Sequence, residues 1–131
     1  MEGYSCKISN CSKALSVQER IKIKDLSNAI PLDSTVTDDT PVIITPDFFA
    51  VLEVHNERSK DKDYKKYVIV DKAGNKYTTG SESFWSAFTD IAKEIAEAIE
   101  NGEPIDEYSI EVYRLPSKNY AGKSFLTCSL A

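Results

Sequence analysis

The hydrophobic repeat changes within one short stretch of this sequence, and that change limits the folds open to the chain. Residues 67–70 are an apolar run typical of a β-strand, and a second strand-like run, residues 76–79, follows a turn at Gly74-Asn75. From there on, large apolar residues recur at the spacing of one helix face, at Phe84, Phe88, Ile91, Ile95 and Ile99. A β-hairpin therefore leads directly into a long amphipathic helix, which needs a sheet to cover.

Three further segments show strand patterns. Residues 42–57 alternate in polarity, with a break near Pro46-Asp47, and residues 108–115 and 125–130 follow the helix. Thr79 and Glu82 fit a capping box that would begin the helix near Gly80-Ser81. The helix is expected to end near Asn101, because Gly102 and Pro104 follow.

This order of elements predicts a mainly β fold with one long helix. A helix between strands three and four of a five-stranded barrel is the plan of the oligonucleotide/oligosaccharide-binding (OB) fold. We expect residues 41–131 to form this OB-like domain, with Phe84, Phe88, Ile91 and Ile95 plugging the barrel. Residues 1–40 would be an N-terminal extension packed on or beside it, within a single domain overall. In that extension, Ser16 and Glu19 fit another capping box, although residues 20–24 also alternate as a strand would.

The composition indicates an ordinary globular protein. The chain has 131 residues, 41% of them hydrophobic and 28% charged, and contains no apolar run long enough to cross a membrane. Its N-terminus lacks the plan of a signal peptide, and three cysteines are an odd number for a disulfide framework. We therefore expect reduced thiols and a cytoplasmic location.

Motifs for catalysis and for metal or cofactor binding do not stand out. His55 is the only histidine, and the Cys6 to Cys11 spacing does not match a zinc ligand pair. Residues 71–82 lack the inner ligands and the glycine of a calcium loop. Phosphate-binding loops and nucleophile elbows are not found either. We predict a protein that is not an enzyme, with no metal and no cofactor.

Charge is unevenly distributed along the chain, although the net value is −5. Residues 58–77 hold seven Lys/Arg and three Asp, a local +4, and residues 108–131 hold three Lys/Arg and one Glu, a local +2. Residues 82–107 hold eight acids and one Lys, a local −7. Whether this asymmetry in sequence becomes an asymmetry in space depends on the fold.

Basic and aromatic residues gather on the elements that an OB barrel uses for binding. Lysines that follow phosphates and flat rings that stack on bases are what single-stranded nucleic acid requires, and stacking is indifferent to base identity. The predicted nucleic-acid-binding residues are Lys60, Lys62, Lys65, Lys66, Tyr67, Lys72, Lys76, Tyr77, Tyr113, Arg114, Lys118, Tyr120 and Lys123. Taken one at a time, such lysines are more often solvated loop residues and such tyrosines core residues, so the hypothesis depends on their clustering.

Two stretches carry a resemblance to a known group of proteins. Residues 67–85, YVIVDKAGNKYTTGSESFW, and residues 113–123, YRLPSKNYAGK, resemble small phage-encoded proteins that bind single-stranded DNA. The resemblance covers roughly residues 41–131 and implies an OB-like fold with a role in phage DNA replication or recombination, inside an infected bacterial cell. Bacterial single-stranded-DNA-binding proteins end in an acidic tail that recruits repair proteins, whereas this chain ends Thr127-Cys128-Ser129-Leu130-Ala131.

The leading functional hypothesis is therefore sequence-neutral binding of single-stranded DNA. Self-association and contacts with host or phage replication proteins are compatible with it, and no membrane partner is expected. The alternative is an acidic protein-interaction module, a phage or plasmid protein that uses residues 82–107 to bind a host enzyme or defence component. Binding of double-stranded nucleic acid or RNA is a third hypothesis.

Overall fold

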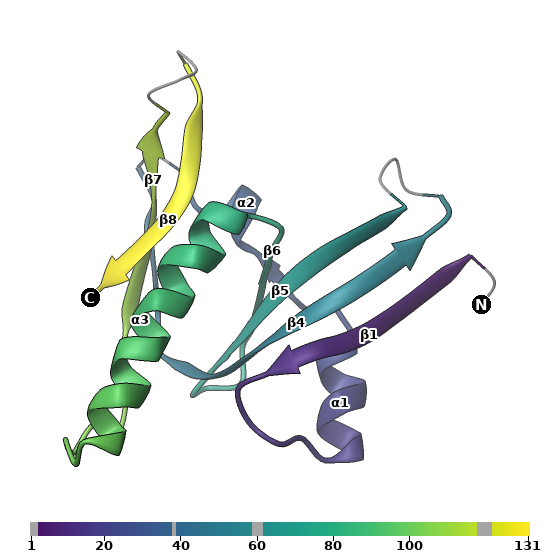
Figure 1. Cartoon of the computed structure of the whole chain (residues 1–131). Coiled ribbons are helices and arrows are strands. Elements are labelled where there is room, and N and C mark those ends of the chain that lie inside the picture. Colours follow the sequence, from purple (N-terminus) through teal and green to yellow (C-terminus); the bar gives the residue numbers. More distant parts are fainter. Residues whose placement is uncertain (1–2, 38, 59–61, 118–121) are drawn as a thin grey trace. The chain divides into compact units, whose positions relative to one another are not determined.

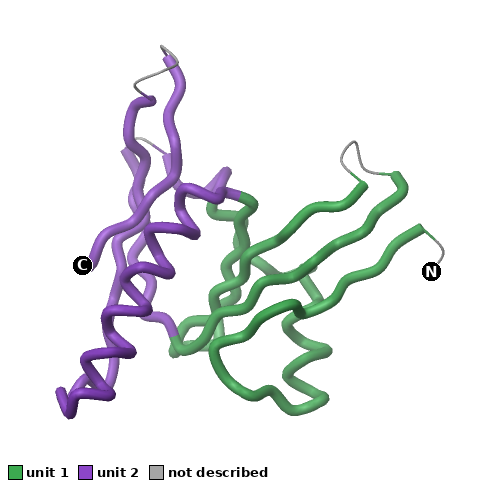
Figure 2. Tube along the Cα trace, viewed as in Figure 1, with its two compact units in different colours: residues 1–32, 47–80 green, residues 33–46, 81–131 purple. Residues whose placement is uncertain are grey.

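A computed structural model describes residues 3–37, 39–58, 62–117 and 122–131 (Figure 1). The chain divides into two compact units, each built from two separate parts of the sequence (Figure 2). Unit 1 comprises residues 1–32 and 47–80, and unit 2 comprises residues 33–46 and 81–131. Both units thus draw on residues from either side of the boundary expected near residue 40. The expectation of a single domain overall stays a prediction.

Unit 1 contains a five-stranded sheet and one helix. The strands lie in the order β1-β4-β5-β6-β2, and β2 pairs with β6 in parallel. Their bounds, with that of the helix, are β1 Tyr4–Cys11, α1 Val17–Lys24, β2 Ile30–Pro31, β4 Pro46–Asn56, β5 Asp63–Asp71 and β6 Lys76–Thr79.

The core of unit 1 lies on the face of this sheet that α1 covers. Alternate residues of β4, namely Phe48, Ala50, Leu52 and Val54, pack with Ile23 of α1 and Val68 of β5. α1 begins at Ser16, whose side chain accepts a hydrogen bond from the backbone of Glu19, while the Glu19 side chain accepts one from the backbone of Ser16. The predicted capping box is therefore confirmed, and residues 20–24 are helical.

β1 is a strand that the sequence did not predict. It pairs antiparallel with β4, so the N-terminal segment belongs to the same sheet as the strongest strand pattern in the chain. The register slips between Ile8 and Asn10. This bulge interrupts the alternation of polarity that would otherwise mark the strand.

Unit 2 contains a three-stranded antiparallel sheet covered by one long helix. The strand order is β3-β7-β8, and α3 packs along β8. A short helix, α2, precedes the sheet. The bounds are α2 Leu32–Thr35, β3 Val42–Ile44, α3 Glu82–Glu100, β7 Ile110–Pro116 and β8 Ser124–Leu130.

The first half of α3 supplies the core of unit 2. Phe84 and Phe88 are fully buried, their rings stacked with centroids 6.1 Å apart, and Trp85 lies 5.3 Å from Phe88. The helix begins at Glu82, close to the start predicted near Gly80-Ser81, but its N-cap is Ser81 and not Thr79. It ends as predicted, with Asn101 as the C-cap and Gly102 at φ +91°.

The predicted mainly β class is confirmed, as is the order of strands around the long helix. The break predicted near Pro46 is also present, and it sends β3 and β4 into different sheets. The described strands form two open sheets, so closure into a five-stranded barrel is not confirmed. Side chains on the inner face of α3 become more exposed toward its C-terminus: Ile91 and Ile95 are half-buried, and Ile99 is 49% exposed.

Candidate nucleic-acid interface

The predicted binding residues are distributed over both units. Lys60, Lys118 and Tyr120 lie outside the described residues. Unit 1 contains Lys62, Lys65, Lys66, Tyr67, Lys72, Lys76 and Tyr77, and unit 2 contains Tyr113, Arg114 and Lys123. Each unit is therefore considered as a separate surface.

Formal charge divides between the same two units. By sequence, unit 1 holds twelve Lys/Arg and nine Asp/Glu, a net +3, whereas unit 2 holds four Lys/Arg and twelve Asp/Glu, a net −8. The acidic stretch, residues 82–107, lies wholly in unit 2. The asymmetry seen along the sequence thus becomes a difference between two folded units, and unit 1 is the one suited to an anionic partner.

Several of the predicted residues are engaged inside the protein. The Lys76 ammonium donates to the carbonyl oxygens of Lys22 and Asp25 at the end of α1, and burial lowers its pKa. Lys72 forms an ion pair with Asp47, with Nζ 3.6 Å from Oδ1. Tyr67 is only 7% exposed, so its ring offers no open face to a base. Tyr77 is half-buried, and burial, followed by Asp71, raises its pKa.

Alternation along β5 sends the neighbouring lysines to opposite faces of the sheet. Val68 points into the α1-covered core, so Lys66 and Tyr64, two and four residues before it, lie on that same face. Lys65 lies on the other face. Toward its N-terminus, β5 therefore presents a tyrosine and a lysine together beside the core.

Tyr4 on β1 joins Tyr64 on this face. Cys6 packs against the core cluster, so Tyr4, two residues before it, has the same orientation. Burial raises the pKa of Tyr4, and the nearby Cys6 and Tyr64 add to the effect. Burial also raises the pKa of Cys6, while Lys24 of α1 opposes that rise. Tyr4 thus interacts electrostatically with Tyr64, and Cys6 with Lys24.

The result is an exposed basic and aromatic surface made by three elements. Tyr4 is 41% exposed and Tyr64 37% exposed, Lys24 is exposed, and Lys66 is half-buried. We call this set, Tyr4, Lys24, Tyr64 and Lys66, the Tyr4–Tyr64 surface. Lys62 lies in the β4–β5 connection immediately before β5, and its Nζ is 3.4 Å from Glu57 Oε2, in an exposed ion pair that a phosphate could replace.

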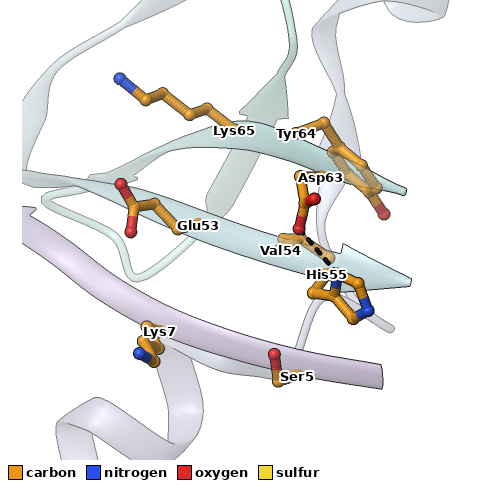
Figure 3. Close-up of a pocket in the computed structure, with 8 residues that line it drawn as sticks. All are labelled: Ser5, Lys7, Glu53, Val54, His55, Asp63, Tyr64 and Lys65. Carbon is orange, nitrogen blue, oxygen red and sulfur yellow. Dashed lines mark hydrogen bonds and ion pairs between the residues drawn. The ribbon is translucent and has the colours of Figure 1, made fainter. Parts of the chain in front are cut away.

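The opposite face of the same sheet has a groove of about 350 Å³ with mixed charge (Figure 3). Figure 3 shows Glu53 on the middle strand, with Lys7 and Lys65 on the strands to either side. Ser5, His55 and Asp63 continue the groove toward the strand ends. The acid between the two lysines makes this face less suited to a phosphate chain than the Tyr4–Tyr64 surface.

Unit 2 presents a different exposed face on the β7–β8 hairpin. Leu115 pairs with Phe125 and Tyr113 with Thr127, which places the two rings on one side of the sheet. Phe125 is 38% exposed and Leu115 42%, Tyr113 is half-buried, and Lys123 is exposed just before β8. Arg114 points elsewhere, because its side chain donates to the backbone of residues 33–36.

Sequence reasoning missed Tyr4, Lys24, Tyr64 and Phe125. The alternation of residues 62–66 was a usable signal, since it separates Tyr64 and Lys66 from Lys65. The contributions of Tyr4 and Lys24 required knowing that β1 and α1 join the same sheet. Among the described residues, His, Cys, Asp and Glu form no group able to hold a metal ion, and no described helix is long and apolar enough to span a membrane.

Comparisons of the chain with protein-family models, with curated proteins and with solved structures find no match.

Proposed function

We propose that this protein binds single-stranded DNA without strong sequence preference, and that the Tyr4–Tyr64 surface of unit 1 makes the contact. One observation carries the proposal. Two exposed tyrosines, Tyr4 and Tyr64, share one sheet face with Lys66, and α1, which covers that face, contributes Lys24, all in the unit with net charge +3. Rings of this kind contribute about 1–3 kcal/mol per stacked base, and lysines neutralise the phosphates that connect the bases.

The biological setting comes from the resemblance of residues 67–85 and 113–123 to phage single-stranded-DNA-binding proteins. On that basis the protein would act in phage DNA replication or recombination, in the cytoplasm of an infected bacterium. The OB-like arrangement belongs to the same proposal. Stacking on a sheet face does not require a closed barrel, since open sheets also present aromatic platforms to single strands.

A fluorescence-polarisation titration tests the proposal directly. Single- and double-stranded oligonucleotides of the same sequence are compared at about 50 and 200 mM salt, the range over which phosphate contacts weaken. Contacts from Lys24, Lys62 and Lys66 predict a slope of log affinity against log salt of about −2 for the single strand, at roughly −0.7 per phosphate. Affinity that does not change with salt would rule out the phosphate contacts.

Lys65 and Lys66 provide a matched pair of variants. Lys66→Glu and Lys65→Glu change the net charge equally at adjacent positions, but on opposite faces of the sheet. We expect Lys66→Glu to weaken single-strand binding, while Lys65→Glu has little effect. Tyr64→Thr removes the ring, keeps a residue suited to strands, and should weaken binding about tenfold, the equivalent of ~1.4 kcal/mol. If Lys65→Glu weakened binding more than Lys66→Glu, the interface would lie on the groove face instead.

The second candidate function is protein interaction through unit 2. It is favoured by the net charge of −8 in this unit and by Ile99, which α3 exposes between Glu97 and Glu100. A host enzyme or defence component with a basic surface would be the partner. This alternative predicts that neither oligonucleotide binds, whereas the leading proposal predicts binding that Glu97→Lys and Glu100→Lys do not abolish.

A further inference from the structure

His55 lies between two carboxylates at the end of β4. Its Nδ1 is 2.7 Å from Asp63 Oδ1, and its Nε2 is 2.7 Å from Glu57 Oε1 (Figure 3 shows the Asp63 bond). An ionised carboxylate only accepts hydrogen bonds, so both ring nitrogens must carry protons for both bonds to form. The arrangement therefore requires the imidazolium form of His55.

Both carboxylates connect His55 to the tyrosines on the other face of the sheet. Asp63 begins β5 and immediately precedes Tyr64. The Glu57 N–H donates to the Gly3 carbonyl oxygen at 2.7 Å, and Gly3 immediately precedes Tyr4. Through these bonds His55 joins the ends of β1, β4 and β5, where the two rings are displayed.

Other charged and titratable groups surround this bridge. Lys62 lies 3.4 Å from the second oxygen of Glu57. Ser5 and Lys7 face the groove from β1, Glu53 from β4, and Lys65 from β5. The groups that raise the pKa of His55 are the two bonded carboxylates, Asp63 first and then Glu57.

We propose that His55 is a positioning residue for the Tyr4–Tyr64 surface and that its protonation strengthens binding of single-stranded DNA. This inference rests on the proposed function. His55 lies on the sheet face opposite the rings, because it directly follows Val54 on β4 and the Val54 side chain is in the core cluster. It acts by holding strand ends in register, without touching the nucleic acid.

The direction of the pH effect follows from the same contacts. Hydrogen bonds from His55 to Asp63, and then to Glu57, raise its pKa above the ordinary value of 6.5, against a smaller opposing effect of desolvation. The bridge is fully formed below about pH 6.5 and is lost as the pH rises through the raised value. A neutral imidazole donates only one hydrogen bond, so one of the two carboxylates is released.

Because His55 is the only histidine in the chain, its protonation can be followed without assignment. The proton NMR signal of its ring in the free protein should titrate with a midpoint above 6.5, and Asp63→Ala should lower that midpoint. In parallel, fluorescence polarisation of a single-stranded oligonucleotide should show affinity falling about threefold from pH 6 to pH 8.5, the scale of one exposed ion pair. His55→Gln should bind weakly at both pH values, with melting behaviour used to confirm that it folds.

Asp63→Ala separates positioning from simple charge. It adds a net positive charge, so a direct electrostatic effect of this region would strengthen binding. Positioning predicts the opposite, weaker binding at pH 6 and a flat pH profile. An NMR midpoint at or below 6.5 overturns the bridge. Binding that is independent of pH, or strengthened by Asp63→Ala, overturns the inference while the proposed function stands. Absence of binding at every pH overturns both.

Discussion

The Arg114 side chain donates from Nε to the carbonyl oxygen of Val36 across 2.7 Å. A second nitrogen of the same guanidinium, Nη2, donates to the carbonyl oxygen of Asp33. These bonds attach β7 to α2 and to the residue that follows it, 81 and 78 residues earlier in the chain. Arg114 was predicted as a nucleic-acid contact, but its hydrogen-bonding groups are directed at the backbone of unit 2.

Replacing Arg114 should therefore affect stability more than binding. Arg114→Ala leaves two carbonyl oxygens without their charged donor, and a loss of about 1–3 kcal/mol in the free energy of unfolding is expected. Urea denaturation followed by circular dichroism measures it. Lys123→Ala, at an exposed position just before β8 of the same hairpin, is the control and should be nearly neutral. Weaker oligonucleotide binding at unchanged stability would instead make Arg114 a phosphate contact.

Phe88→Ala should be strongly destabilising. The ring is fully buried between Phe84 and Trp85, and truncation of such a residue costs roughly 3–5 kcal/mol through lost burial and the cavity left behind. Ile99→Ala on the same helix, where the side chain is half-exposed, should cost well under 1 kcal/mol. Similar melting temperatures for the two variants would show that the first half of α3 is not the anchor of unit 2.

The elements around Phe88 were predictable because their signals are local. The spacing of Phe84, Phe88 and Ile91 marks one helix face, and Gly102 marks its end. Pro46 marks the break between β3 and β4, since proline has no N–H to continue a ladder. The sheet partners of each strand were not predictable in the same way, because they depend on contacts far apart in sequence.

β1 illustrates this limit. Tyr4 to Cys11 alternates only up to a bulge, and what makes it a strand is pairing with residues of β4 that come 39 (Cys11 with Ala50) to 52 (Tyr4 with Asn56) positions later. Lys65 and Lys66 illustrate the same limit for the Tyr4–Tyr64 surface. They are indistinguishable by composition, and only the burial of Val68 shows which of the two shares a face with the exposed rings.

The capping box of α1 gives a prediction with a pH dependence. Ser16→Ala removes the acceptor for the Glu19 N–H and should cost about 1 kcal/mol. Ser86→Ala, at an exposed position inside α3, is the matched control and should be neutral or slightly stabilising. Both are measured by chemical denaturation at neutral pH.

Acid should weaken the same cap. The hydrogen bond from the Ser16 backbone lowers the pKa of Glu19 most, and the bond with the Ser16 side chain comes next. Lys13 contributes less. This stabilisation is present above the ordinary value of 4.5 and is lost as the pH falls through the lowered value. Glu19→Gln keeps an acceptor without the charge, so it should remove this part of the acid sensitivity. An unchanged acid profile in that variant would exclude Glu19 as its source.

Reactivity of the three thiols should report on the core of unit 2. Burial raises the pKa of Cys128 to about 11, and its side chain lies among the buried residues of β8, whereas Cys6 and Cys11 are half-buried in unit 1. At pH 8 only on the order of one Cys128 in a thousand is a thiolate, the reactive form. Treatment of the native protein with a disulfide reagent such as DTNB should therefore modify Cys6 and Cys11 in a fast phase and Cys128 in a slow phase.

Two variants test this assignment. The slow phase of the DTNB reaction should disappear in Cys128→Ala. Phe88→Ala should make the slow phase faster, because opening of the loosened core exposes the thiol. A Cys128 that reacts as fast as the other two in the native protein would contradict its burial against α3.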